Sequence, residues 1–308
     1  MESHFYSHGK LLITGEYLVL DGAQALAIPT KYGQDLVVTP IKQPIILWKS
    51  INELGEIWFE LELSLDIFNT ASKLEAWFDS ADAVSRRLVH ILKQAQHLNA
   101  KFLNDEKGYT ISTHQDFNSS WGLGTSSTLI NNIAQWAHID AFQLSDMTFG
   151  GSGYDIACAQ HSKAILYQVK GIERTINTVS FDPAFSNHLY FVHLKQKQNS
   201  REAIKKYQSK KHEIQPIILR INALSKAILE CNDLPTFQKL LDEHEQLIEN
   251  VIEETSIKER LFSDFNGSMK SLGAWGGDFV LVASEDNPEP YFNSKGFDTL
   301  IPFNDMIL

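Results

Sequence analysis

The sequence has little cysteine and no long apolar segment. Only Cys158 and Cys231 occur among its 308 residues, and neither belongs to a CxxC motif or a Cys/His cluster, so neither a disulfide framework nor a zinc site is indicated. No apolar run approaches the roughly 20 residues that cross a bilayer, and the opening MESHFYSHGK has no apolar segment. We therefore expect a cytoplasmic protein that does not bind membranes.

Basic residues are also few, with 27 Lys and Arg against 38 Asp and Glu and a formal charge of -11. A field of that sign repels phosphate backbones, so no nucleic-acid partner is expected. A small anionic substrate remains compatible, because only charges within about 8 to 10 Å of its pocket act on it at physiological salt. Hydrophobic residues make up 43% of the chain, which is enough to form a globular core.

The hydrophobic pattern changes along the chain from strand-like to helix-like. Between Leu11 and Trp48, the short apolar segments LLIT, YLVL, ALAI, LVVT and IILW predict strands. Residues 83–98 and much of the stretch 200–270 have helical periodicity. The change predicts a domain boundary near residue 170, and hence domains 1–170 and 171–308.

A glycine-rich segment, SSWGLGTSST (119–128), precedes one predicted helix. Glycines let backbone amides approach a phosphate, a helix N-terminus adds N–H groups, and hydroxyl groups can bind Mg²⁺. The segment is not a Walker P-loop, because Thr125 follows Gly124 and no lysine occurs between Gly124 and Lys163. Taken alone, it fits an ordinary capped helix equally well.

Three further segments accompany it: SHGKLLITGEYLVLDG (7–22), GGSGYDIACA (150–159) and KSLGAWGGDFVLVAS (270–284). Together the four segments resemble the signature of the GHMP kinases, which act on galactose, homoserine, mevalonate or phosphomevalonate. The resemblance implies an α+β, two-domain α/β fold. Its N-terminal domain would be ribosomal S5 domain 2-like, with a ferredoxin-like GHMP kinase domain at the C-terminus.

The resemblance implies ATP and Mg²⁺ as cofactors and assigns roles by position. The expected ATP-binding residues are Gly122, Leu123, Gly124, Thr125, Ser126 and Ser127. Ser126 is the expected Mg²⁺ ligand. Asp155 is the expected catalytic base, and Lys10 is expected to lie near it and lower its pKa. Capping of a short helix is the simpler role for Asp155.

The implied acceptor is mevalonate or phosphomevalonate. Expected substrate-binding residues are Glu16, Tyr17, Gly153, Tyr154, Lys197, Ser200, Gly273, Gly276 and Gly277. Lys197 and Ser200 belong to a basic stretch, and such a stretch is more often a solvated helix face. Mevalonate kinases usually have GEH where this chain has GEY, and no glutamate for a second metal contact occurs between residues 119 and 172.

Other interpretations remain open. They include homoserine kinase, a decarboxylase relative that also phosphorylates its substrate, and a noncatalytic nucleotide-binding sensor that has kept the fold. The presence of Asp155 and Lys10 favours an enzyme over a sensor. A homodimer is compatible with the sequence.

Overall fold

The computed structural model describes residues 1–104, 107–196, 204–205, 207–209, 214–273, 275 and 277–308. They form two compact units, each built from several parts of the chain. The first unit contains residues 1–9, 32–119 and 124–160, and the second contains residues 10–31, 120–123 and 161–308. The domain boundary expected near residue 170 stays a prediction.

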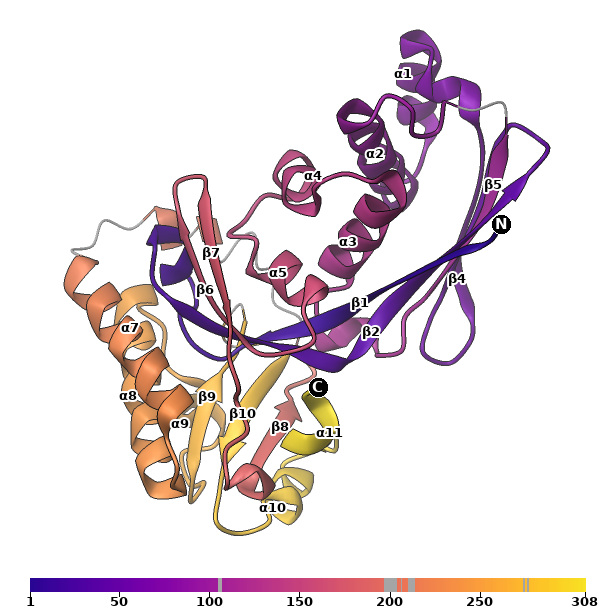
Figure 1. The fold of residues 1–308 in the computed structure, drawn as a ribbon. Coiled ribbons are helices and arrows are strands. Elements are labelled where there is room, and N and C mark those ends of the chain that lie inside the picture. The colour runs from indigo at the N-terminus through magenta and orange to yellow at the C-terminus, as the bar shows by residue number, and fades with distance from the viewer. Residues whose placement is uncertain (105–106, 197–203, 206, 210–213, 274, 276) are drawn as a thin grey trace. The chain divides into compact units, whose positions relative to one another are not determined.

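The first unit combines a β-sheet with helices (Figure 1). Its strands are residues 3–9 of β1 (Ser3–Leu12), the C-terminal part of β2 (Ala25–Ile41), β3 (Ile45–Ile51), β4 (Ile57–Ser64) and β5 (Gly108–His114). Strand β3 pairs in parallel with β5 and antiparallel with β4, and residues 37–41 of β2 pair antiparallel with β5. Its helices are η2 (Leu65–Phe68), α1 (Ala71–Ser80), α2 (Ala83–Leu98), α3 (Thr125–Ala137), α4 (Ala141–Thr148) and α5 (Tyr154–Gln160).

Helix α2 illustrates how the sequence builds this unit. Asp82 begins the helix by accepting hydrogen bonds from two first-turn amides, and the buried Leu88, Leu92 and Ala95 recur at helical spacing. Helices α2, α3 and α4 pack on one another (Figure 1), and α5 packs on α3. Their apolar faces share one core with the strands, which fixes the two helices that carry GLGTSS and Asp155.

The second unit contains two groups of strands. Residues 25–27 of β2 pair antiparallel with β6 (Ile165–Lys170), which pairs antiparallel with β7 (Glu173–Thr178). A separate antiparallel sheet has the order β11 (Leu300–Pro302), β8 (Leu189–His193), β10 (Phe279–Ala283) and β9 (Ser268–Ser271). Strands and helices are thus mixed in both units, which confirms the expected α+β class.

The helices whose bounds lie within the described residues of the second unit include η1 (Leu18–Asp21), η4 (Ser186–His188), α7 (Gln215–Glu230), α8 (Leu234–Ile252), α9 (Ile257–Leu261), α10 (Glu289–Ser294) and α11 (Phe303–Met306). The short helix η3 (Ser119–Trp121) precedes GLGTSS. Helices α7 and α8 lie side by side, and α8 packs on β9 (Figure 1). Within the described ranges, no helix has both the length and the apolar composition that spanning a membrane requires.

One predicted strand is wrong. The segment YLVL (17–20) does not extend a sheet, because Leu18–Asp21 form the 3₁₀ helix η1, which ends at Gly22 in a left-handed conformation with φ 93°. Leu18 and Val19 are buried, and a short uninterrupted apolar run fits a buried helical turn as well as a strand. The segment LLIT is only half strand, since β1 ends at Leu12.

Candidate active site

The GLGTSS segment starts α3 with a glycine cap. Gly124 is the N-cap residue and has φ 94°, a left-handed conformation that side chains with a Cβ rarely adopt. The amides in the first turn of a helix have no hydrogen-bond partner within the helix. A glycine cap has no side chain that could accept hydrogen bonds from them. Those amides and the positive end of the helix dipole favour an anion. The residues present therefore fit a phosphate group at the first turn of α3.

The hydroxyl groups of this turn differ in exposure. Ser127 is buried and donates to the carbonyl oxygen of Gly124 at 2.8 Å, and Thr128 donates to Oε1 of Gln34 at 2.8 Å. These two bonds fasten the turn to itself and to β2. Ser126 is exposed, and its hydroxyl is an oxygen ligand of the kind that Mg²⁺ accepts. No three His, Cys, Asp or Glu side chains in the described part of the chain form a metal-binding group.

Asp155 lies in the first turn of α5, after Gly153, which has φ 86°. The carboxylate is half-buried, and its Oδ1 accepts a hydrogen bond of 3.1 Å from the amide of Ile156. The helix dipole at this end favours the ionised carboxylate, which is the form that a proton acceptor needs. The position thus suits both capping and catalysis, and the roles of Gly153, Tyr154 and Asp155 stay predictions.

Buried amide side chains, which the sequence analysis did not single out, join α3 to α5. Asn131 donates to Oγ of Ser7 on β1 at 2.8 Å and accepts from Nε2 of Gln160 on α5 at 3.1 Å. Ser7 in turn donates to Oδ1 of Asn132 at 2.7 Å. Consequently, the helices that carry Ser126 and Asp155 are linked by directional bonds as well as by apolar packing. Both asparagines lie within a predicted helix, so in the sequence they look like ordinary helix residues.

Lys10 contacts the residues that precede Gly124. Its ammonium group donates to the carbonyl oxygen of Gly122 at 2.6 Å, and its backbone amide donates to the carbonyl oxygen of Leu123 at 2.9 Å. Gly122 has φ 65°, and a Cβ there would lie 2.1 Å from Oδ2 of Asp278. A side chain at 122 would therefore be strained and would collide with Asp278. The Lys10 ammonium group and Asp278, which belongs to the segment 270–284 (called the closing motif below), both lie against this backbone. The role of Lys10 toward a phosphate stays a prediction.

The closing motif contains three left-handed residues in its described part. Gly273 has φ 61°, Trp275 has φ 56° and Asp278 has φ 40°. Gly273 is half-buried and Gly277 is buried. Three expected substrate-binding residues, Lys197, Ser200 and Gly276, lie outside the described residues.

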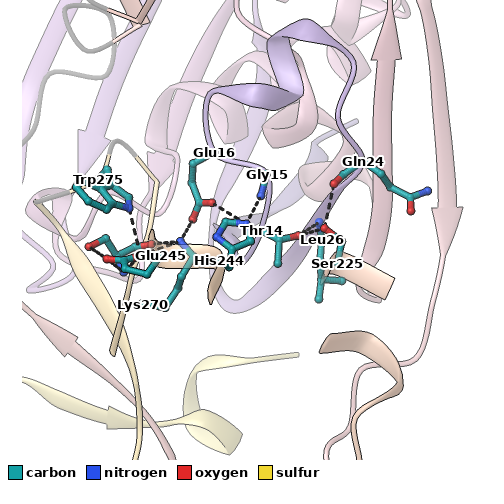
Figure 2. Close-up of polar contacts among 11 residues, drawn as sticks. Thr14, Gly15, Glu16, Gln24, Leu26, Ser225, His244, Glu245, Lys270 and Trp275 are labelled. Carbon is teal, nitrogen blue, oxygen red and sulfur yellow. Dashed lines mark hydrogen bonds and ion pairs between the residues drawn. The ribbon is translucent and has the colours of Figure 1, made fainter. Parts of the chain in front are cut away.

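Glu16 and Tyr17 lie in the interior of the second unit. Glu16 is 0% exposed, and its Oε1 forms an ion pair of 2.5 Å with Nζ of Lys270, which is also 0% exposed (Figure 2). Burial raises the pKa of Glu16 to about 7, although Lys270 opposes the shift. Tyr17 is buried with φ 59° and packs against Tyr207 at a ring separation of 5.5 Å. These contacts are internal, and a role of either residue toward substrate stays a prediction.

His244 on α8 contacts the segment 7–22, which also contains Glu16 and Tyr17. The amide of Gly15 donates to its Nε2 at 3.0 Å (Figure 2), so this nitrogen carries no proton and the imidazole is neutral. Burial agrees with that state, because it lowers the pKa of His244 well below its ordinary value. Nδ1 of His244 and Oε2 of Glu16 are buried without a hydrogen-bond partner among the described residues.

Solved structures with the same architecture identify the fold. Mevalonate kinase from Methanococcus jannaschii superimposes with a TM-score of 0.69 and 16% identity, covering 98% of this chain and 97% of that one. Streptococcus pneumoniae phosphomevalonate kinase in complex with phosphomevalonate and AMPPNP gives 0.70 and 14%, covering 97% and 99%. Lactococcus lactis galactokinase complexed with galactose gives 0.64 and 14%, covering 96% and 88%.

This chain therefore has the GHMP kinase fold, which confirms the resemblance in its motifs. No protein-family model matches its sequence, and no curated protein sequence matches it either.

Proposed function

We propose that this protein is an ATP-dependent small-molecule kinase. The observation that carries the proposal is the first turn of α3, where Gly124 caps the helix with φ 94° and Ser126 presents an exposed hydroxyl. Backbone amides at a glycine-capped helix start are suited to a phosphate group. The GHMP kinase fold supports the same conclusion, because its solved examples include a complex with AMPPNP.

We propose a separate role in phosphoryl transfer for each of the residues 122–127, Asp155 and Lys10. The backbone amides of residues 122–127 would hold the ATP phosphates, and Ser126 would hold Mg²⁺, which supplies positive charge to the phosphate oxygens when bound. Asp155 would accept the proton of the acceptor, and Lys10 would stabilise negative charge near the glycine motif. Phosphoryl transfer needs little more than such positioning and charge stabilisation.

We propose mevalonate or phosphomevalonate as the acceptor, so that the phosphoryl group passes to a hydroxyl or a phosphate oxygen. The sequence GSGYD (151–155) supports this choice, as does the phosphomevalonate that a structural relative binds. Galactokinase has the same fold, so the fold by itself does not select an acceptor. Gly153, Tyr154, Glu16 and Tyr17 are proposed to bind the acceptor. Gly273 and Gly277, the described glycines of segment 270–284 with this proposed role, would approach the ATP phosphates or the acceptor.

Measuring ADP release with mevalonate, phosphomevalonate, homoserine and galactose in parallel tests the proposal. We expect Mg²⁺-dependent release with one of the first two acceptors and background release with galactose. ADP release with homoserine alone would contradict the proposed acceptor but would still support the proposed kinase activity. ATP binding without release in any assay would favour the noncatalytic sensor.

A further inference from the structure

A buried carboxylate on α8 binds the start of the closing loop, a name used here for the described residues 271–273, 275 and 277–278. Glu245 is 6% exposed. Its two oxygens accept hydrogen bonds of 3.1 Å from the amide of Ser271, and Oε1 accepts one of 2.5 Å from the Ser271 hydroxyl. Oε2 accepts one of 3.2 Å from Nε1 of Trp275 (Figure 2). One side chain therefore holds two points of the loop.

Lys270 supplies the counter-charge for this carboxylate. Its Nζ lies 3.5 Å from Oε2 of Glu245 and 2.5 Å from Oε1 of Glu16 (Figure 2). Burying charged groups is costly, and apolar residues of similar size often give an equally stable core. The feature that an apolar residue could not reproduce at position 245 is the set of directed bonds to the loop.

Two described residues of the loop held by Glu245 have an unfavourable backbone conformation. Trp275 has φ 56° and Asp278 has φ 40°, and both residues carry a Cβ that disfavours the left-handed region. Strained conformations of this kind persist only where surrounding contacts impose them, and they cluster at ligand-binding loops. At Trp275 those contacts are the bond to Glu245 and burial of the ring, which is 1% exposed in an apolar cluster.

We infer that Glu245 is a positioning residue that fixes the closing loop in the conformation that presents Gly273 to a phosphate group of the ligand. The inference rests on the proposed kinase function for the identity of that ligand. Glu245 acts through Ser271 and Trp275 and contributes no group to the reaction. It therefore governs ligand affinity and loop order, whereas Asp155 governs the chemical step.

Glu245→Gln tests the inference, because it keeps the shape of the side chain and removes one of its two acceptor oxygens. Glu243→Gln is the matched control on the same helix, since the Glu243 side chain is 40% exposed and pairs with Arg220 at 2.5 Å. In hydrogen exchange without nucleotide, Glu245→Gln should speed exchange at the Ser271 and Trp275 amides about tenfold, which corresponds to one lost bond to a charged group. The KM for Mg·ATP should rise about tenfold with kcat changed less, and Glu243→Gln should match the wild type in both.

Trp275→Phe keeps the test decisive if Glu245→Gln fails to fold, because it removes only the indole donor. It should reproduce part of the faster exchange at Ser271. Unchanged exchange at residues 271–275 in both variants would overturn the inference, as would an equal increase across β10, which indicates general loosening. Faster loop exchange with an unaltered KM would also overturn the inference, because it would show that the conformation of the loop does not affect ligand binding. If the wild type transfers no phosphoryl group, the kinase proposal fails, while exchange still reports whether Glu245 positions the loop.

Discussion

The ammonium group of Lys10 donates a hydrogen bond of 2.6 Å to the carbonyl oxygen of Gly122, although 112 positions separate the two residues in the sequence. The amide of Lys10 donates to the next carbonyl, that of Leu123. The opening motif is thereby attached to the glycine motif through both its side chain and its backbone. This attachment gives the lysine a defined position against the backbone of residues 122 and 123.

Replacing this lysine should impair use of ATP. Lys10→Met removes the ammonium group proposed to stabilise negative charge on the phosphates. Loss of one charge-assisted interaction of about 2 kcal/mol in the transition state should lower kcat/KM for Mg·ATP roughly 30-fold. Lys31→Met is the control, because Lys31 is an exposed lysine on β2 that also donates to a carbonyl, that of Asn304. Steady-state kinetics with varied ATP would measure both. Equal values for wild type and Lys10→Met would exclude the proposed role.

The two adjacent serines of α3 should respond differently to substitution. Ser126→Ala removes the exposed hydroxyl proposed to hold Mg²⁺, so the Mg²⁺ concentration for half-maximal turnover should rise several-fold. Ser127→Ala instead removes the bond to Gly124 and should lower the free energy of unfolding by about 1 kcal/mol. A Mg²⁺ titration and a urea titration of each variant separate the effects. The same Mg²⁺ midpoint in Ser126→Ala and wild type would withdraw Ser126 as a ligand.

Protonation of Glu16 should affect stability near neutral pH. The carboxyl faces Lys270, His244 and Glu245, and burial raises its pKa from 4.5 to about 7. Between these values the folded state binds more protons than the unfolded state, so this group makes the free energy of unfolding fall as pH rises. His244 acts oppositely, since its lowered pKa makes stability rise with pH up to its ordinary value of 6.5.

Glu16→Gln removes only the first of these contributions. From pH 5 to 7, the free energy of unfolding of the variant should therefore rise relative to that of the wild type by about 2 kcal/mol. Urea titrations at four pH values in this range would measure the difference in slope, regardless of any overall destabilisation. Parallel curves for the two proteins would show that Glu16 does not titrate there.

Local patterns predicted much of this fold. The helical spacing within residues 83–98 located α2, and the apolar runs ALAI, LVVT and IILW located parts of β2 and β3. The order of the glycine motifs indicated the GHMP kinase fold, which the solved structures confirm. The pattern failed at YLVL, where an apolar run without alternation does not distinguish a strand from a buried turn.

Local sequence patterns did not predict contacts between residues that lie far apart in the sequence. No motif indicates that Glu245 binds Ser271, or that Asn131 connects Ser7 to Gln160, because these contacts depend on how helices pack. Glu245, the second glutamate in DEHEQ (242–246), and the asparagines in LINN (129–132) look like ordinary helix residues in the sequence. Burial would have been the useful signal, since a fully buried carboxylate or amide must find partners.

The chemical role of Asp155 is the central claim, and one comparison tests it most directly. Transfer of ³²P from γ-labelled ATP to the acceptor should be measured for the wild type and for Asp155→Asn, with ATP affinity measured on the same samples. If Asp155 accepts the acceptor's proton, the variant should bind ATP within a few-fold of the wild type while its turnover falls about 10²- to 10⁴-fold. Turnover equal to that of the wild type would contradict the account.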